Sequence, residues 1–137
     1  MLIAVDFDGT IVEHRYPEIG KEIPFATDTL RRLISEQHRL VLWTMRTGDL
    51  LDEALDWCRE HGVEFYAVNC DFPDQEYTEG MPRKIKVDMV IDDRNVGGLP
   101  DWGVIYDMIH RNITYQEYMI ESLTGHSPQQ RKKHWWQ

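Results

Sequence analysis

The sequence is short of cysteine, of long apolar runs and of positive charge. Its 137 residues include two cysteines, Cys58 and Cys70, which form neither a CxxC pair nor a disulfide framework. No apolar stretch approaches the ~18 residues that a membrane span requires, and Asp6 stands too near the N-terminus for a secretory signal. With 24 Asp and Glu against 15 Lys and Arg, the net charge of -9 disfavours nucleic acid and anionic membranes as partners. We therefore expect a cytoplasmic protein.

What the chain does contain is an alternation of two hydrophobic patterns over a length that fits one domain of about 100–200 residues. Four short apolar runs are typical of buried strands, namely residues 2–5, 40–43, 63–68 and 87–91. Apolar residues at helical spacing alternate with them over residues 24–38, 51–62, 103–111 and 114–123, with a short edge strand expected near Leu99 and a loop over residues 71–82. The alternation predicts an α/β fold, a Rossmann-like three-layer sandwich with a central parallel sheet.

Polar residues with related chemistry follow three of the predicted strands. These are Asp6-Phe7-Asp8-Gly9-Thr10 after the first strand, Thr44-Met45-Arg46 after the second, and Asp92-Asp93 after the last. Because ligands bind outside the carboxyl ends of parallel strands, we expect the four aspartates to lie near one another at one edge of the sheet. Clustered carboxylates repel unless a cation lies among them, and oxygen ligands favour Mg²⁺, which commonly shares its coordination sphere with a substrate phosphate. The cluster therefore predicts a magnesium site and a phosphate ester or anhydride as substrate.

A bound phosphate also needs hydrogen-bond donors and a positive charge. Thr44 supplies a hydroxyl, the turn from Asp8 to Thr10 can supply backbone N–H groups, and either Lys84 or Lys86 can supply the charge. Each feature alone has an ordinary structural explanation, because Asp-Gly is a common turn and a short basic stretch is usually a surface. Their joint arrangement at three strand ends favours a function.

In this order the motifs resemble those of the haloacid dehalogenase (HAD) superfamily of phosphohydrolases. Its four motifs are similar, in turn, to Asp6–Thr10, Leu40–Thr44, Lys84 and Ile91–Asp93. The resemblance extends from Leu2 to about Asn95. Ile85 stands where a proline commonly follows the lysine of the third motif, so Lys86 stays open as the alternative to Lys84.

The resemblance implies a two-step phosphoryl transfer. Asp6 would be the nucleophile that forms an aspartyl-phosphate, and Asp8 would protonate the leaving group and then activate a water molecule. The implied metal ligands are Asp6, the backbone carbonyl of Asp8, and Asp92, with Asp93 nearby. The implied phosphate-binding residues are Gly9, Thr44, Met45 and Lys84. Because Asp8 marks the phosphatases of this superfamily, the resemblance disfavours dehalogenation.

The connections between the motifs are too short for a lid domain. Residues 9–43 have room for one helix and a small flap, here defined as residues 11–23, and residues 45–83 for a helix, a strand and a loop. We therefore expect a capless catalytic core over residues 1–124. Arg46, two residues after Thr44, and His14 in the flap are candidate contacts to the substrate.

The remaining residues, 125–137, form a basic tail that contains Trp135 and Trp136. Aromatic and cationic groups together suit single-stranded nucleic acid, but aromatic residues are also enriched where subunits meet. We favour packing or a contact between subunits of a homo-oligomer over binding to nucleic acid.

Three functions stay open. The intact pair Asp6 and Asp8 favours a magnesium-dependent phosphatase that acts on a small phosphomonoester, such as a sugar phosphate or a nucleotide. The open site leaves two alternatives, a phosphatase of nucleic-acid ends or phosphoproteins, and a non-catalytic phosphate-binding module. A receiver domain has the opposite order, because there the acidic pair follows the first strand and the phosphorylated aspartate follows the third.

Overall fold

A computed structural model describes residues 1–126 of the chain. The structure divides into two compact units, Met1–Trp102 and Gly103–Gln137, which are described separately. The predicted division into a core over residues 1–124 and a tail over 125–137 stays a prediction, and Trp135 and Trp136 lie outside the described residues.

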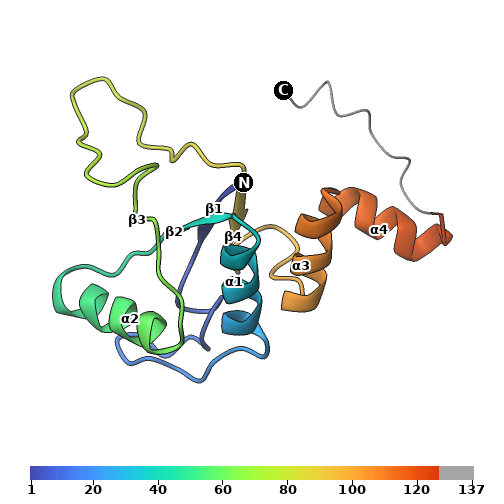
Figure 1. Ribbon diagram of the computed structural model, residues 1–137, viewed down its shortest axis with the longest axis horizontal. Helices are drawn as coiled ribbons and strands as arrows, with labels where there is room; N and C mark the ends of the chain where they lie inside the picture. The colour runs from blue at the N-terminus through green and yellow to red at the C-terminus, as the bar shows by residue number, and fades with distance from the viewer. Residues whose placement is uncertain (127–137) are drawn as a thin grey trace. The chain divides into compact units, whose positions relative to one another are not determined.

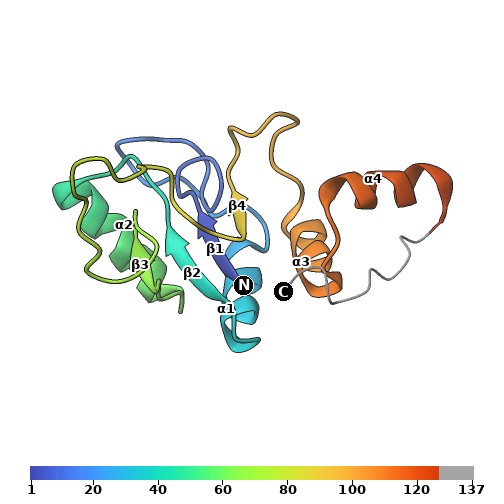
Figure 2. The same cartoon turned by 90° about the horizontal axis from the view of Figure 1, so that it is seen from above.

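The first unit is built on a parallel sheet, as the alternating pattern predicts. Its strands are β1 (Leu2–Val5), β2 (Arg39–Leu42), β3 (Ala67–Val68) and β4 (Met89–Ile91). They lie in the order β3-β2-β1-β4, which Figure 2 shows from above with β3 and β4 at the two ends of the sheet. The α/β class with a parallel sheet is thus confirmed, and no connection in residues 1–126 holds an inserted lid domain.

Strand β1 lies at the centre and fixes where the following residues meet. Ile3, Ala4 and Val5 are fully buried, which explains the continuous apolar run in the sequence. Val5 lies in register with Leu42 on one side and with Ile91 on the other. The three polar segments that follow β1, β2 and β4 therefore begin at the same edge of the sheet.

Two helices complete the first unit (Figure 1). Helix α1 (Ala26–Ser35) connects β1 to β2, contacts β2 and buries Leu30 and Leu33. Helix α2 (Gly48–Glu60) connects β2 to β3 and buries Ala54 and Cys58, two of the residues at helical spacing. On α2, the Trp57 ring also packs edge-on against Phe7, with ring centroids 5.8 Å apart.

The structure differs from the sequence-based prediction at the edges of the sheet. Strand β3 has two residues in place of the predicted 63–68, and it pairs only with β2. One hydrogen bond extends that pairing at each end, from the N–H of Tyr66 to the Leu40 carbonyl at 2.7 Å and from the N–H of Asn69 to the Leu42 carbonyl at 2.8 Å. The strand predicted near Leu99 was wrong. Gly97 and Gly98 precede it with positive φ angles of 92° and 81°, and such backbone forms a turn rather than a strand.

The connection from β3 to β4 is a long loop, yellow-green in Figure 1. It contains no helix, as predicted for residues 71–82, and Ile85 anchors its far end in the core against Ala4 and Val41.

The second unit contains most of α3 (Trp102–Arg111) and all of α4 (Tyr115–Thr124). The capping box predicted from Thr114 and Glu117 is confirmed, since each side chain accepts a hydrogen bond from the other residue's backbone N–H, at 3.1 and 2.9 Å. Arg111 connects the two helices by binding Asp107 at 3.0 Å and Glu121. Among the helices of residues 1–126, none combines the length and the apolar character needed to cross a membrane.

Candidate metal and phosphate site

Three carboxylates converge where β1 and β4 end. Asp6, Asp92 and Asp93 each place one oxygen so that all three lie within 4.8 Å of one another. The parallel register produces this arrangement, because Asp6 follows β1, Asp92 follows β4, and the N–H of Asp6 donates to the carbonyl of Ile91 at 2.9 Å. The structure thus brings together three of the four aspartates that the sequence places in a metal site.

Thr10 holds two of these carboxylates in place. Its side chain is fully buried, and its hydroxyl lies 3.1 Å from an oxygen of Asp6 and 3.2 Å from one of Asp93. The hydroxyl oxygen of Thr10 also accepts a hydrogen bond from the N–H of Asp93 at 3.1 Å. The indole N–H of Trp102 donates to the Thr10 carbonyl at 3.0 Å. Sequence reasoning used Thr10 only for its backbone N–H, which donates to the Phe7 carbonyl at 3.2 Å, and gave its hydroxyl no role.

Gly9 lets the backbone pass close to Asp93. Its φ is +84°, and a Cβ atom there would lie 2.4 Å from a carboxylate oxygen of Asp93. The N–H of Gly9 donates to the carbonyl of Val12 at 2.7 Å, so this donor is used within the turn. In the hydrogen bonds of residues 1–126, the neighbouring N–H of Asp8 has no acceptor and is available to an anion.

The acidic cluster carries an unbalanced charge. Burial, a hydrogen bond with Asp93 and the charge of Asp92 together raise the pKa of Asp6 from 3.8 to about 7. No Lys or Arg of the described chain forms an ion pair with any of the three carboxylates. A hard divalent cation fits this donor set of oxygens alone, and would replace the proton that Asp6 otherwise retains.

Thr44 lies beside this cluster at the end of β2. The N–H of Trp43 donates to the Val5 carbonyl at 2.8 Å, so Thr44 follows β2 next to the segment that begins with Asp6. Its own N–H donates to the side chain of Asn69 at 2.8 Å, and its hydroxyl oxygen accepts the N–H of Arg46 at 3.1 Å. The hydroxyl proton of Thr44 is left to serve as a donor.

Met45 and Asn69 complete this side of the site. Met45 is 87% exposed, and its N–H donates to no acceptor within residues 1–126. Asn69 follows β3 with a φ of +55° and positions Thr44. Sequence reasoning missed Asn69, for which the only signal was a polar residue at the end of a predicted strand.

Asp8 lies apart from the acidic cluster and binds Arg46. Its two carboxylate oxygens accept hydrogen bonds from Nε and Nη2 of Arg46, each at 2.8 Å. The side chain of Arg46 is completely buried and that of Asp8 is 12% exposed. The hydrogen bond with Asp8 raises the pKa of Arg46 above its ordinary value. The sequence predicts that Arg46 contacts the substrate. The structure instead buries its side chain in the fold, where the guanidinium binds Asp8.

The remaining predicted residues lie at the surface. His14, Lys84 and Lys86 are exposed, and the two lysines flank the buried Ile85. The N–H of Lys86 donates to Asp71 at 2.7 Å. Among the described residues neither lysine forms an ion pair with the acidic cluster, and the choice between Lys84 and Lys86 as the phosphate-binding residue stays a prediction.

No family model and no curated protein matches the sequence. A solved structure of a conserved protein from Bacteroides thetaiotaomicron is 62% identical to the chain, with a TM-score of 0.80 over 86% of this chain and 96% of that one. The chain belongs to the family of this conserved protein. A structure of D,D-heptose 1.7-bisphosphate phosphatase from B. bronchiseptica, complexed with magnesium and phosphate, is 17% identical with a TM-score of 0.40, over 61% of this chain and 55% of that one. That likeness is too low to support a conclusion about function.

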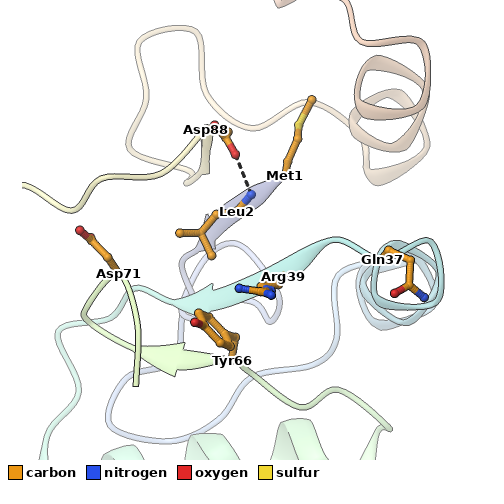
Figure 3. A pocket seen from close by; sticks show the side chains of 7 residues that line it. All are labelled: Met1, Leu2, Gln37, Arg39, Tyr66, Asp71 and Asp88. Atoms are coloured by element: carbon orange, nitrogen blue, oxygen red, sulfur yellow. Dashed lines mark hydrogen bonds between the residues drawn. The ribbon is translucent and has the colours of Figure 1, made fainter. Parts of the chain in front are cut away.

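A second feature, a pocket of about 330 Å³, lies at the opposite edge of the sheet (Figure 3). It is lined by Met1, Leu2, Gln37, Arg39, Tyr66, Asp71 and Asp88. Leu2 and Arg39 begin β1 and β2, whereas the acidic cluster follows the strands. Its charged groups already have partners, because Asp88 accepts the N–H of Leu2 at 2.8 Å and Arg39 lies 4.8 Å from the centre of the Tyr66 ring. This pocket is therefore separate from the candidate site.

Proposed function

We propose that the chain is a capless, magnesium-dependent phosphatase of the haloacid dehalogenase superfamily. Its substrate is a small phosphomonoester, such as a sugar phosphate or a nucleotide, and the reaction passes through an aspartyl-phosphate. The observation that carries this proposal is the convergence of Asp6, Asp92 and Asp93 within 4.8 Å at the carboxyl edge of a parallel sheet, with Thr44 following the neighbouring strand β2.

The metal would be held by the carboxylates of Asp6, Asp92 and Asp93 together with the backbone carbonyl of Asp8. When bound, Mg²⁺ offsets the negative charge of the carboxylate and phosphate groups and polarises the phosphoryl group. The pKa of about 7 for Asp6 supports this assignment, because a cation in the cluster would hold Asp6 in the ionised state that a nucleophile requires.

The chain's own groups then divide the reaction into two displacements. A carboxylate oxygen of Asp6 forms a bond to phosphorus while the bond to the leaving oxygen breaks, and Asp8 donates the proton that the leaving oxygen takes up. In the second step Asp8 removes a proton from water, whose oxygen binds phosphorus and releases Asp6. Four groups hold the phosphoryl oxygens. They are the hydroxyl of Thr44, the N–H groups of Asp8 and Met45, and the side chain of Lys84.

The open site also admits larger substrates. No lid covers the acidic cluster in residues 1–126, and Met45 beside it is 87% exposed. A phosphorylated protein segment or a nucleic-acid end is therefore the second candidate substrate. A non-catalytic phosphate-binding module has no use for Asp8, so the presence of Asp8 favours an enzyme.

The decisive test is release of phosphate from a broad panel of phosphorylated metabolites, oligonucleotide ends and phosphopeptides, with and without Mg²⁺. We expect turnover of small phosphomonoesters that requires Mg²⁺ and disappears in Asp6→Asn, whereas the matched variant Asp52→Asn, on the exposed face of α2, keeps the wild-type rate. Preference for oligonucleotide ends or phosphopeptides would select the second candidate. Unchanged turnover in Asp6→Asn would contradict the proposed chemistry.

A further inference from the structure

The guanidinium of Arg46 has every one of its donors in use. Nε and Nη2 bind the two carboxylate oxygens of Asp8 at 2.8 Å each. Nη1 donates to the carbonyls of Pro17 and Leu50 at 3.2 and 3.3 Å, and Nη2 donates to the carbonyl of Glu18 at 3.1 Å. An arginine offers five N–H donors, so none is left for a substrate in this arrangement.

The partners of Arg46 come from three separate parts of the first unit. Asp8 follows β1, Pro17 and Glu18 belong to the flap (blue in Figure 1), and Leu50 lies in the first turn of α2. The charge also lies 5.2 Å from the centre of the Phe7 ring and 5.3 Å from that of Tyr16. A single buried side chain thus connects the catalytic strand end to the flap.

We propose that Arg46 is a positioning residue that fixes the Asp8 carboxylate and the flap relative to one another. This inference rests on the proposed function, in which Asp8 transfers a proton to the leaving group. Proton transfer depends on a donor within hydrogen-bond reach of the leaving oxygen, so a displaced Asp8 carboxylate would slow that step. Arg46 acts through Asp8 and touches neither the substrate nor the phosphoryl group.

Lysine cannot reproduce this arrangement. Its ammonium group has three donors on a single atom and cannot bind both oxygens of a carboxylate in the parallel geometry of a guanidinium. It also cannot reach the carbonyls of Pro17, Glu18 and Leu50 at the same time. Arg46→Lys should therefore show the same defects as Arg46→Met, at smaller amplitude.

The kinetic test compares two kinds of leaving group in Arg46→Met and Arg46→Lys. An alkyl phosphate needs a proton on its leaving oxygen, whereas acetyl phosphate releases a stable carboxylate. We expect kcat/KM of Arg46→Met, which reports the first displacement, to fall about 100-fold on the alkyl phosphate and less than about 10-fold on acetyl phosphate, with no rise in KM. The control is Arg59→Met, which removes an exposed arginine of α2 that binds Asp56. Equal losses on both substrates with a raised KM would show that Arg46 binds the phosphate, and would overturn the inference.

A double-mutant cycle with Asp8→Asn tests whether Arg46 acts through Asp8. Measured on acetyl phosphate, Arg46→Met should reduce the rate of the Asp8→Asn variant no further, because residues that act as a unit are not additive. The double variant also carries no unpaired buried charge, and so it remains usable where Arg46→Met does not fold. Losses that multiply would contradict the inference.

A measurement without substrate or metal separates this inference from the proposed function. The flap is closed by hydrogen bonds from the N–H of Glu13 to Lys21 at 2.7 Å and from that of Ile23 to Ile11 at 2.9 Å. Loss of the charged hydrogen bonds of Arg46 should speed amide exchange at Glu13 and Ile23 by about 10-fold or more, and Arg59→Met should not. Unchanged exchange in both Arg46 variants would overturn the inference. A wild-type protein that releases no phosphate from any substrate would overturn the proposed function while this comparison still stands.

Discussion

Thr10 shows how one uncharged side chain can hold two carboxylates that repel each other. Its hydroxyl lies between oxygens of Asp6 and Asp93 at 3.1 and 3.2 Å, in a fully buried position. Groups that orient metal ligands in this way typically contribute 10–100-fold to metal affinity.

We therefore predict that Thr10→Val, which keeps the shape and removes the hydroxyl, weakens Mg²⁺ binding by about 10-fold or more, whereas Thr10→Ser keeps most of it. Isothermal titration with Mg²⁺ measures this directly. The matched control is Thr27→Val, since Thr27 is also a buried threonine that donates to a carboxylate, that of Glu22 at 2.8 Å. An equal affinity in the Thr10→Val and Thr27→Val variants would contradict the assigned role.

Residues of the candidate site could be predicted from the sequence where chemistry and position coincide. Asp6 and Asp92 are charged residues that interrupt apolar runs, and parallel pairing of those runs brings them together. Thr10 and Asn69 could not be predicted in the same way, because a threonine or an asparagine in a turn has many ordinary explanations. The burial of Arg46 could not be predicted from the sequence either, because it depends on where the carbonyls of the flap lie.

At the scale of elements, the flap depends on one glycine. Gly20 lies opposite Glu13 in the hairpin, and a Cβ atom at Gly20 would lie 2.1 Å from the Glu13 carbonyl oxygen. Backbone atoms cannot move away from such a contact without opening the hydrogen bond from Glu13 to Lys21.

Gly20→Ala should consequently open the flap while the sheet stays intact. We expect faster amide exchange at Glu13 and a higher KM for the phosphomonoester substrate, with little change in Mg²⁺ affinity. Gly103→Ala is the matched control, because Gly103 lies in α3 without a positive φ and a Cβ there would meet nothing within 4 Å. Amide exchange that is as slow in Gly20→Ala as in the wild type would show that the flap does not need this close approach.

Helices and strands with a clear hydrophobic or capping pattern could be predicted from the sequence, and the extent of the sheet at its edges could not. Strand β1 matches the apolar run over residues 2–5, and α4 begins at the predicted capping box. Strand β3 is shorter than the apolar run that contains it, because only Ala67 and Val68 of that run pair with β2. The strand predicted near Leu99 was prevented by the two preceding glycines, whose positive φ angles the sequence does not reveal.

For the whole molecule, the acidic cluster couples stability to pH and to metal. The net charge is -9, and Asp6 has a pKa of about 7 in the folded chain against 3.8 for the ordinary side chain. Between these two pH values the folded state holds a proton at Asp6 that the unfolded state has lost. The contribution of Asp6 to the free energy of unfolding therefore falls as pH rises from about 4 to about 7 in the absence of metal. Metal binding has the opposite sign, because Mg²⁺ displaces that proton and binds better as pH rises through about 7.

The prediction concerns the stability of the wild type and of Asp6→Asn, which should agree at low pH and diverge as pH rises. In EDTA, Asp6→Asn should equal the wild type in Tm below about pH 4 and exceed it increasingly up to about pH 7, because asparagine resembles the protonated aspartate. In Mg²⁺ at about 100 times its Kd, the wild type should gain about 2.7 kcal/mol at pH 8 and little at pH 5.5, while Asp6→Asn gains nothing at either pH. Thermal unfolding of the wild type and of Asp6→Asn, each in EDTA and in Mg²⁺ at several pH values, measures these effects. Subtracting the Tm of the variant from that of the wild type removes the contribution of the other carboxylates. A difference in Tm that does not depend on pH would show that Asp6 is ionised without a metal, and that the cluster needs no cation to balance its charge.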